Sequence, residues 1–265
     1  MGSASRQALA AARAELSALG STVDLQTAQQ LFSAARSIGG SLQLRTLLAD
    51  ASTDPGVKKK AIVAVFGARF GSTAIDLLSS VASRRWSSDE DLLAGIEELG
   101  IRAAAESAAF GTPIEAELFA FGTAVSSSAE LELAVGSKLG DTAAKVALVD
   151  RLLDGKVSPQ TLAIVNQLVQ QPRGRRIGAQ LRSAASVVAD QSNLSVGTVT
   201  TARPIGAEQL IRLQAGLSKT YGKNLRINAV VDPSLIGGIR VQVGDDVIDG
   251  SVASRLHDLR LQLVG

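Results

Sequence analysis

The spacing of the apolar residues changes near residue 193, and this change constrains the fold more than any other feature. Before it, leucine, isoleucine and alanine recur at intervals of three and four, the spacing of one helix face. After it, apolar and polar residues alternate, as in 194–201, which is the pattern of a strand with one buried face. The sequence therefore predicts a mainly α protein: an all-helical bundle with a tandem second helical unit, followed by a small α/β domain on a mixed sheet.

Helix start signals divide the part before residue 193. Asp24 precedes an apolar run at helical spacing, and Asp54-Pro55 opens another, because aspartate caps a helix and proline suits its first turn. A first helix is expected over 5–19 and a long one over 89–109. Aromatic residues make up only 3% of the chain and hydrophobic residues 46%. We therefore expect helices that approach closely through alanine and leucine.

A weak internal repeat runs through the helical part. Residues 41–44 read SLQL and residues 130–133 read ELEL, while residues 59–63 read KKAIV and residues 145–149 read KVALV. The offsets differ slightly, as short insertions in loops would cause. Two helical units of similar design are therefore expected in tandem. The predicted domains are an N-terminal helical bundle over 1–111, a second helical unit over 112–193 and an α/β domain over 194–265.

Turn residues organise the C-terminal domain. Gly237-Gly238 predicts a corner with positive φ, a conformation that glycine adopts readily, and Gly244-Asp245 marks a hairpin turn. Ser251 is placed to cap a last helix. Strands are expected over 194–201, 224–231, 239–243 and 246–248, with helices over 208–221 and from Ser251 to Leu263.

Residues suited to catalysis or metal binding are few. The chain has no cysteine and a single histidine, His257, which excludes a thiolate zinc site and a relay between two imidazoles. Asp245, Asp246 and Asp249 lack the alternate spacing of a calcium loop, and a hairpin turn explains them better. We therefore expect no enzyme, no metal and no cofactor.

Charge and hydropathy limit the partners. The net charge is only +2, and no apolar run approaches the roughly 18 residues that span a bilayer, so no direct membrane insertion is expected. The densest basic segment is 173–176, which lacks the interleaved aromatic residues of a nucleic-acid groove. It favours a helix–helix turn whose charges are solvated or face an acidic partner. Nucleic-acid binding is the less favoured alternative.

Two stretches near the C-terminus carry a resemblance. One reads VDPSLIGG from Val231 and the other reads VIDGS from Val247. With the strand, hairpin and capped helix around them, they resemble the C-terminal signature of the delta subunit of F-type ATP synthases, the oligomycin-sensitivity-conferring protein of mitochondria. The chain exceeds the common form by about one helical unit, and in this it is similar to the long delta subunits of actinobacteria. The signature residues are Asp232, Pro233, Gly237, Gly238, Asp249, Gly250 and Ser251.

The resemblance implies a non-catalytic stator subunit of a proton-translocating ATP synthase. Such a subunit is present in one copy per complex, at the cytoplasmic face of the cell membrane. Its helical domain holds the N-terminal helix of an alpha subunit, and its C-terminal domain contacts the b subunits of the peripheral stalk. It resists the torque of the rotor.

By chain order, the first helical unit is expected to hold the alpha-subunit helix, between the opening helix and the helix over 89–109. Leu9, Leu16, Leu99 and Ile101 are then candidate contacts, and a place in the core explains them equally well. The alternative function is a general helical adaptor or scaffold unrelated to ATP synthase, which would bind some other helix and no stalk.

Overall fold

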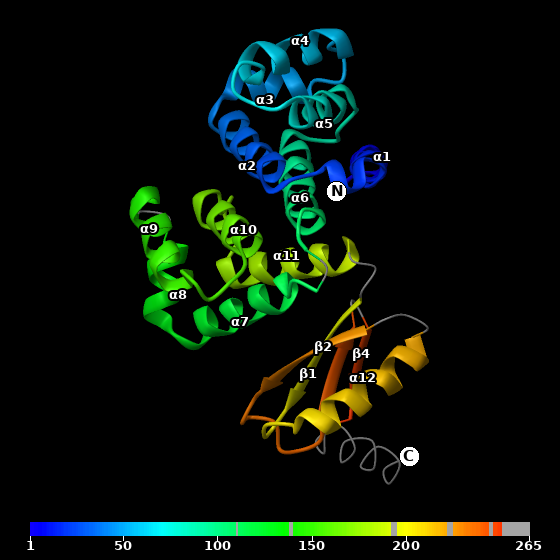
Figure 1. The fold of residues 1–265 in the computed structure, drawn as a ribbon, viewed down its shortest axis with the longest axis vertical. Coiled ribbons are helices and arrows are strands. Elements are labelled where there is room, and N and C mark those ends of the chain that lie inside the picture. The colour runs from blue at the N-terminus through cyan, green and yellow to red at the C-terminus, as the bar shows by residue number, and fades with distance from the viewer. Residues whose placement is uncertain (110, 138–139, 192–194, 222–224, 244–245, 251–265) are drawn as a thin grey trace, which may run out of the picture. The chain divides into compact units, whose positions relative to one another are not determined.

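The computed structural model describes the chain except residues 110, 138–139, 192–194, 222–224, 244–245 and 251–265 (Figure 1). It separates into two compact units, Met1–Val188 and Ala189–Gly265. The first is helical and the second is built on a sheet, so the predicted fold class is confirmed. The helices are α1 (Ser3–Leu19), α2 (Leu25–Gly40), α3 (Leu42–Ala49), α4 (Pro55–Phe66), α5 (Ser72–Ser83), α6 (Asp89–Glu106), α7 (Ile114–Ser127), α8 (Ala129–Gly136), α9 (Thr142–Leu153), α10 (Pro159–Gln170) and α11 (Ile177–Gln191), with a 3₁₀ turn at Gly20–Thr22.

The caps predicted at Asp24 and Asp54 begin their helices as expected, and Ser88 acts in the same way. The Asp24 side chain accepts a hydrogen bond from the Thr27 backbone N–H at 2.7 Å at the start of α2. Asp54 caps α4, whose first residue is Pro55. Ser88 accepts from the Asp91 N–H at 3.1 Å at the start of α6. Each cap satisfies a backbone donor that the first helical turn leaves without a partner.

The helix lengths recur along the chain. Helices α3, α4 and α5 have 8, 12 and 12 residues, and α8, α9 and α10 have the same lengths. They begin at 42, 55 and 72 and again at 129, 142 and 159, a constant offset of 87 residues. This corrects the register read from the sequence motifs, because buried Lys145 corresponds to buried Lys58 and not to Lys59. We call α2–α6 the first helix set and α7–α11 the second helix set.

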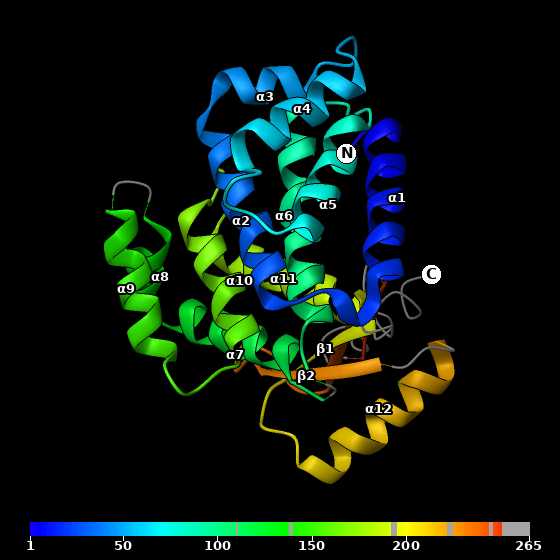
Figure 2. The same ribbon diagram turned by 45° about the horizontal axis from the view of Figure 1, so that its top comes forward.

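The two helix sets share one hydrophobic core. Helix α6 lies at its centre and packs against α1, α2, α3 and α5, and also against α10 (Figure 2). Helix α2 approaches α6 closely at Gly100 of α6. A Cβ added to this glycine would lie 2.5 Å from a ring carbon of Phe32 on α2. Both sets lie within the compact unit Met1–Val188, which is not divided between them. The predicted domain boundary at 111/112 therefore stays a prediction.

The second unit is a four-stranded mixed sheet with a helix. The strand order is β2-β1-β3-β4, with β1 parallel to β2 and antiparallel to β3, and β3 antiparallel to β4. Val199, Ile227 and Val241 form its small core, against leucines of α12. The elements are β1 (Ser195–Thr201), α12 (Ala207–Tyr221), β2 (Leu225–Val231), β3 (Ile239–Val243) and β4 (Asp246–Asp249).

Some predictions fall outside the described residues. These are the turn at Gly244-Asp245, the cap at Ser251 and the last helix, with His257 in it. Among the described residues, no single helix is long and apolar enough to cross a membrane, and α7 and α8 reach that length only together, across a bend of 113°.

Candidate partner-binding surfaces

The four residues predicted to contact a partner helix are buried. Leu16 and Leu99 have no exposed surface, Leu9 is 6% exposed and Ile101 is 4% exposed. Helices α1 and α6 pack directly on each other, so these side chains belong to the shared core. In this conformation they offer no area to a partner, and their role as contacts stays a prediction.

Polar contacts also close α1 onto α6. The Ser5 hydroxyl donates to Asp91 at 2.6 Å and accepts from the Ser87 backbone N–H at 2.9 Å. Arg13 donates to Glu98 at 2.8 Å from the middle of α1. A partner that entered between α1 and α6 would have to break these bonds and open the core.

An open hollow lies beside α1 instead. Its volume is about 1090 Å³, and we call it the α1 hollow. Half-buried Ala4 and Ala11 of α1 line one side, and Arg84 and exposed Arg85 line the other. Arg84 forms an ion pair with Glu15. Small side chains on one wall and guanidinium groups on the other give a surface that can admit a helix backbone and an acceptor.

Trp86 forms part of the wall of the α1 hollow. Its side chain is only 4% exposed, and its indole N–H donates to the Val81 carbonyl at 2.9 Å. The ring lies on α6 at Gly95, where any side chain would collide with it. Trp86 therefore packs as a cap on the helical core.

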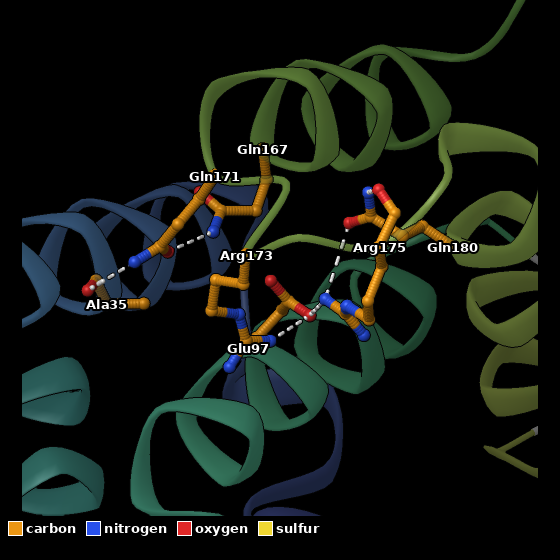
Figure 3. A network of polar contacts seen from close by, with 7 residues as sticks. All are labelled: Ala35, Glu97, Gln167, Gln171, Arg173, Arg175 and Gln180. Carbon is orange, nitrogen blue, oxygen red and sulfur yellow. Dashed lines mark hydrogen bonds and ion pairs between the residues drawn. The ribbon is translucent and has the colours of Figure 1, made fainter. Parts of the chain in front are cut away.

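The basic segment 173–176 supplies an internal brace (Figure 3). Arg173 and Arg175 both donate to one oxygen of Glu97 on α6, at 2.5 and 2.6 Å. The Glu97 side chain is 5% exposed and that of Arg173 is 18% exposed. Burial lowers the pKa of Arg173, and the nearby Glu97 carboxylate opposes this shift. The acidic group that faces these arginines is therefore within the chain.

A second set of bonds joins the two helix sets near the brace. On α10 and just after it, Gln167 and Gln171 are hydrogen-bonded to each other at 3.0 Å, and Gln171 donates to the Ala35 carbonyl of α2 at 3.1 Å (Figure 3). Arg36 of α2 donates to Gln167. No sequence pattern predicted the contacts of Glu97 or Gln171. Glu97 could have been found, because it lies four residues from buried Leu93 and Ile101 on the apolar face of α6.

An apolar hollow of about 340 Å³ lies in the second helix set. We call it the α7 hollow, and Ala120, Phe121, Leu153 and Val157 are among its lining residues. In the first set, Phe66 and Phe70 stack at the positions 87 residues earlier than Leu153 and Val157, with ring centroids 5.0 Å apart. Leu153 and Val157, which line the α7 hollow, are smaller than the phenylalanines at the corresponding positions.

The signature residues of the C-terminal unit shape turns. Asp232 accepts from the Ser234 N–H at 2.9 Å and hydroxyl at 2.7 Å, and these bonds hold the pKa of Asp232 below its usual value. Gly237 and Gly238, which follow Pro233, have φ of 134° and 84°, so the predicted positive-φ corner is confirmed. After β4, the Gly250 N–H donates to the Ile239 carbonyl at 2.9 Å.

The remaining charged groups give no metal site in the described part of the chain. No group of three or more histidine, cysteine, aspartate or glutamate side chains is placed there to hold an ion. Asp249 of the hairpin forms an ion pair with Arg240 at 2.9 Å. These polar contacts join elements of the chain to one another.

The comparisons with known proteins agree with the resemblance. The family described as ATP synthase delta (OSCP) subunit matches residues 101–263. ATP synthase subunit delta of Leifsonia xyli is 53% identical over 265 residues, covering 100% of both chains. That of Streptomyces avermitilis is 39% identical, covering 98% of this chain and 97% of its own. A chain of the Toxoplasma gondii mitochondrial ATP synthase hexamer is 23% identical, with a TM-score of 0.41, over 64% of this chain and 96% of that one. The chain belongs to the ATP synthase delta (OSCP) subunit family.

Proposed function

We propose that this chain joins the peripheral stalk of an F-type ATP synthase to the top of its catalytic head and resists the torque of the rotor. As a family member, it is a non-catalytic component of the stator, and the enzyme is the whole complex. The alternative of an unrelated helical adaptor is not favoured, because the relatives match over the full length.

The full-length identity of 53% to an ATP synthase subunit delta carries this proposal. The structure of the helical unit is compatible with a load-bearing role. Its two helix sets share a core and are joined by the Glu97 brace and by Gln171, so that force applied to one set passes to the other. A hinge between the two helix sets would need fewer buried contacts at their junction.

The partners in this proposal are specific. The helical unit binds the N-terminal helix of an alpha subunit, and the C-terminal unit binds the b subunits. One copy serves each complex, as a peripheral part of the membrane complex at its cytoplasmic face. An amphipathic helix in a groove is a common form of such binding, with anchors one helical turn apart.

Native mass spectrometry of the chain with the catalytic head, stripped of its own delta subunit, tests the proposal. We expect one added mass of this chain per head. The same chain should restore ATP-driven proton pumping to membranes that have been depleted of it. A folded chain that neither binds the head nor restores pumping would refute the stator function.

A further inference from the structure

A hollow of about 450 Å³ lies where the two helix sets meet, and three arginines border it. We call it the arginine hollow. Arg36 of α2 and Arg45 of α3 belong to the first helix set, and Arg173 follows α10 in the second. The volume falls within the range of about 300–1,000 Å³ that small-molecule sites in proteins occupy. The arginine hollow is therefore large enough for a small ligand, and most of the charges on its wall are positive.

Arg36 has a neutral partner in place of a counter-charge. Its guanidinium donates to the side-chain oxygen of Gln167, which is an uncharged acceptor. The Arg36 side chain is half-buried. Burial lowers the pKa of Arg36, and no carboxylate of the described residues opposes this shift. A desolvated cation in such a place becomes more stable when an anion lies beside it.

The other two arginines are only partly neutralised. Arg173 shares the carboxylate of Glu97 with Arg175, as Figure 3 shows. The Nε of Arg173 is buried without an acceptor in the described part of the chain, and its backbone has a φ of 45°, which is unfavourable for a residue other than glycine. Arg45 pairs with Asp89 at 3.0 Å, and these side chains are 30% and 31% exposed. Since each guanidinium carries several N–H donors, the three arginines retain donors for a ligand.

The internal repeat shows that the helical design does not require these cations. Helices α2 and α7 end at residues 40 and 127, so Arg36 corresponds to Thr123. Arg45 corresponds to Glu132 in α8. Helices α7 and α8 form with these residues in place, and both helix sets share one core. The arginines therefore belong to the hollow and not to the structural requirements of the repeat.

We propose that the arginine hollow binds a phosphate group, which Arg36, Arg45 and Arg173 hold from both helix sets. Guanidinium groups match the oxygens of phosphate in paired, charge-assisted hydrogen bonds. A phosphate group supplies the counter-charge that Arg36 lacks, and it ties α2 and α3 to the segment after α10. The ligand is inorganic phosphate or the phosphate ester of a small molecule. This binding goes beyond the stator function and does not depend on it.

Isothermal titration calorimetry of the full chain with sodium phosphate tests the proposal. The buffer contains about 0.1 M sodium chloride, which screens the exposed charges. We expect one site per chain with a Kd of about 1 mM or lower. Arg36→Thr installs the residue that the second helix set carries at this position, and it should raise Kd at least about tenfold. Arg45→Gln should raise Kd in the same way, and it decides the test if Arg36→Thr does not fold.

Two further variants separate binding from a structural effect. Glu90 also borders the arginine hollow and is exposed. Glu90→Gln should lower Kd, because it removes a negative charge that repels the ligand. The matched control is Arg176→Gln, at an exposed arginine of the same segment that does not border the hollow. It should leave Kd unchanged, and circular dichroism should show every variant folded.

Titration with ADP and with adenosine separates the sources of the phosphate group. ADP that binds more tightly than inorganic phosphate, and is displaced by it, identifies an ester as the ligand; weaker binding of ADP identifies the free ion. Adenosine should not bind. An absence of saturable binding, an unchanged Kd in both arginine variants, or equal displacement by chloride, which marks an adventitious ion only, would overturn the proposal. The stator function would stand in each case, because binding to the head tests it separately.

Discussion

The Glu97 brace makes a quantitative prediction about how the two helix sets are held together. In Glu97→Ala, Arg173 and Arg175 lose the carboxylate oxygen that they share. Arg173 is then left largely buried and without its counter-charge, because its side chain is only 18% exposed. Removing one partner of a fully buried ion pair destabilises a protein by about 3–5 kcal/mol.

The expected loss is smaller than that range. The Arg175 side chain is 41% exposed and can turn into water, so only one of the two arginines stays desolvated. We therefore expect Glu97→Ala to lower the free energy of unfolding by about 2–3 kcal/mol. Glu97→Gln keeps an acceptor oxygen in place and should lose less, since a neutral acceptor still satisfies a donor.

Urea unfolding, followed by Trp86 emission, measures this difference within the helical unit. The control is Glu15→Ala, which removes the carboxylate from a more exposed pair with Arg84 and should cost no more than about 1 kcal/mol. If Glu97→Ala unfolds within about 0.5 kcal/mol of wild type, the brace does not join the helix sets.

Four further changes test the packing, a helix cap and a turn. Gly100→Ala places a Cβ 2.5 Å from an aromatic carbon of α2. It should lower the free energy of unfolding, measured by thermal unfolding, by about 1–3 kcal/mol. Gly40→Ala meets no atom within 4 Å and should instead add up to about 1 kcal/mol. Asp24→Ala should cost about 1 kcal/mol at neutral pH. Hydrogen bonds hold the pKa of Asp24 below its usual value, so the stability that Asp24 contributes is complete above about pH 4 and is lost as the pH falls through the folded-state pKa. The free energies of unfolding of wild type and Asp24→Ala should therefore converge in an acid titration. Gly238→Ala must adopt a φ of 84° and should speed hydrogen exchange in β3 of the C-terminal unit, and unchanged exchange would count against a strained corner.

Local signals in the sequence predicted the fold well. The caps at Asp24 and Ser88 and the proline at residue 55 act within one helical turn, so the residues that decide them are neighbours in the sequence. The glycine corner at Gly237-Gly238 is also local, because it depends on the backbone conformation of those two residues.

Which apolar side chains are buried within the chain depends on contacts that no local pattern shows. Leu9 and Leu99 have the spacing of an apolar face, but spacing alone does not say whether another helix of the same chain covers that face. The brace links Glu97 to Arg173, which is 76 residues away. The internal repeat was predicted, but the offset between the repeats differed by one or two residues from the observed 87. The correspondence follows the starts of the helices and not the similar residues within them.

The packing of α6 connects the length of the chain with its core, because α6 contacts helices of both sets. The family match begins at residue 101, within α6, and so omits α1 to α5. Helix α2 packs on both α6 and α10, and it is held there by the bond from Gln171 to the Ala35 carbonyl and by the bond from Arg36 to Gln167. Helix α1 is tied to α6 by Ser5 and Arg13, so the residues before the family match pack onto the matched part of the chain. The helices that precede the family match therefore share the core of the second set.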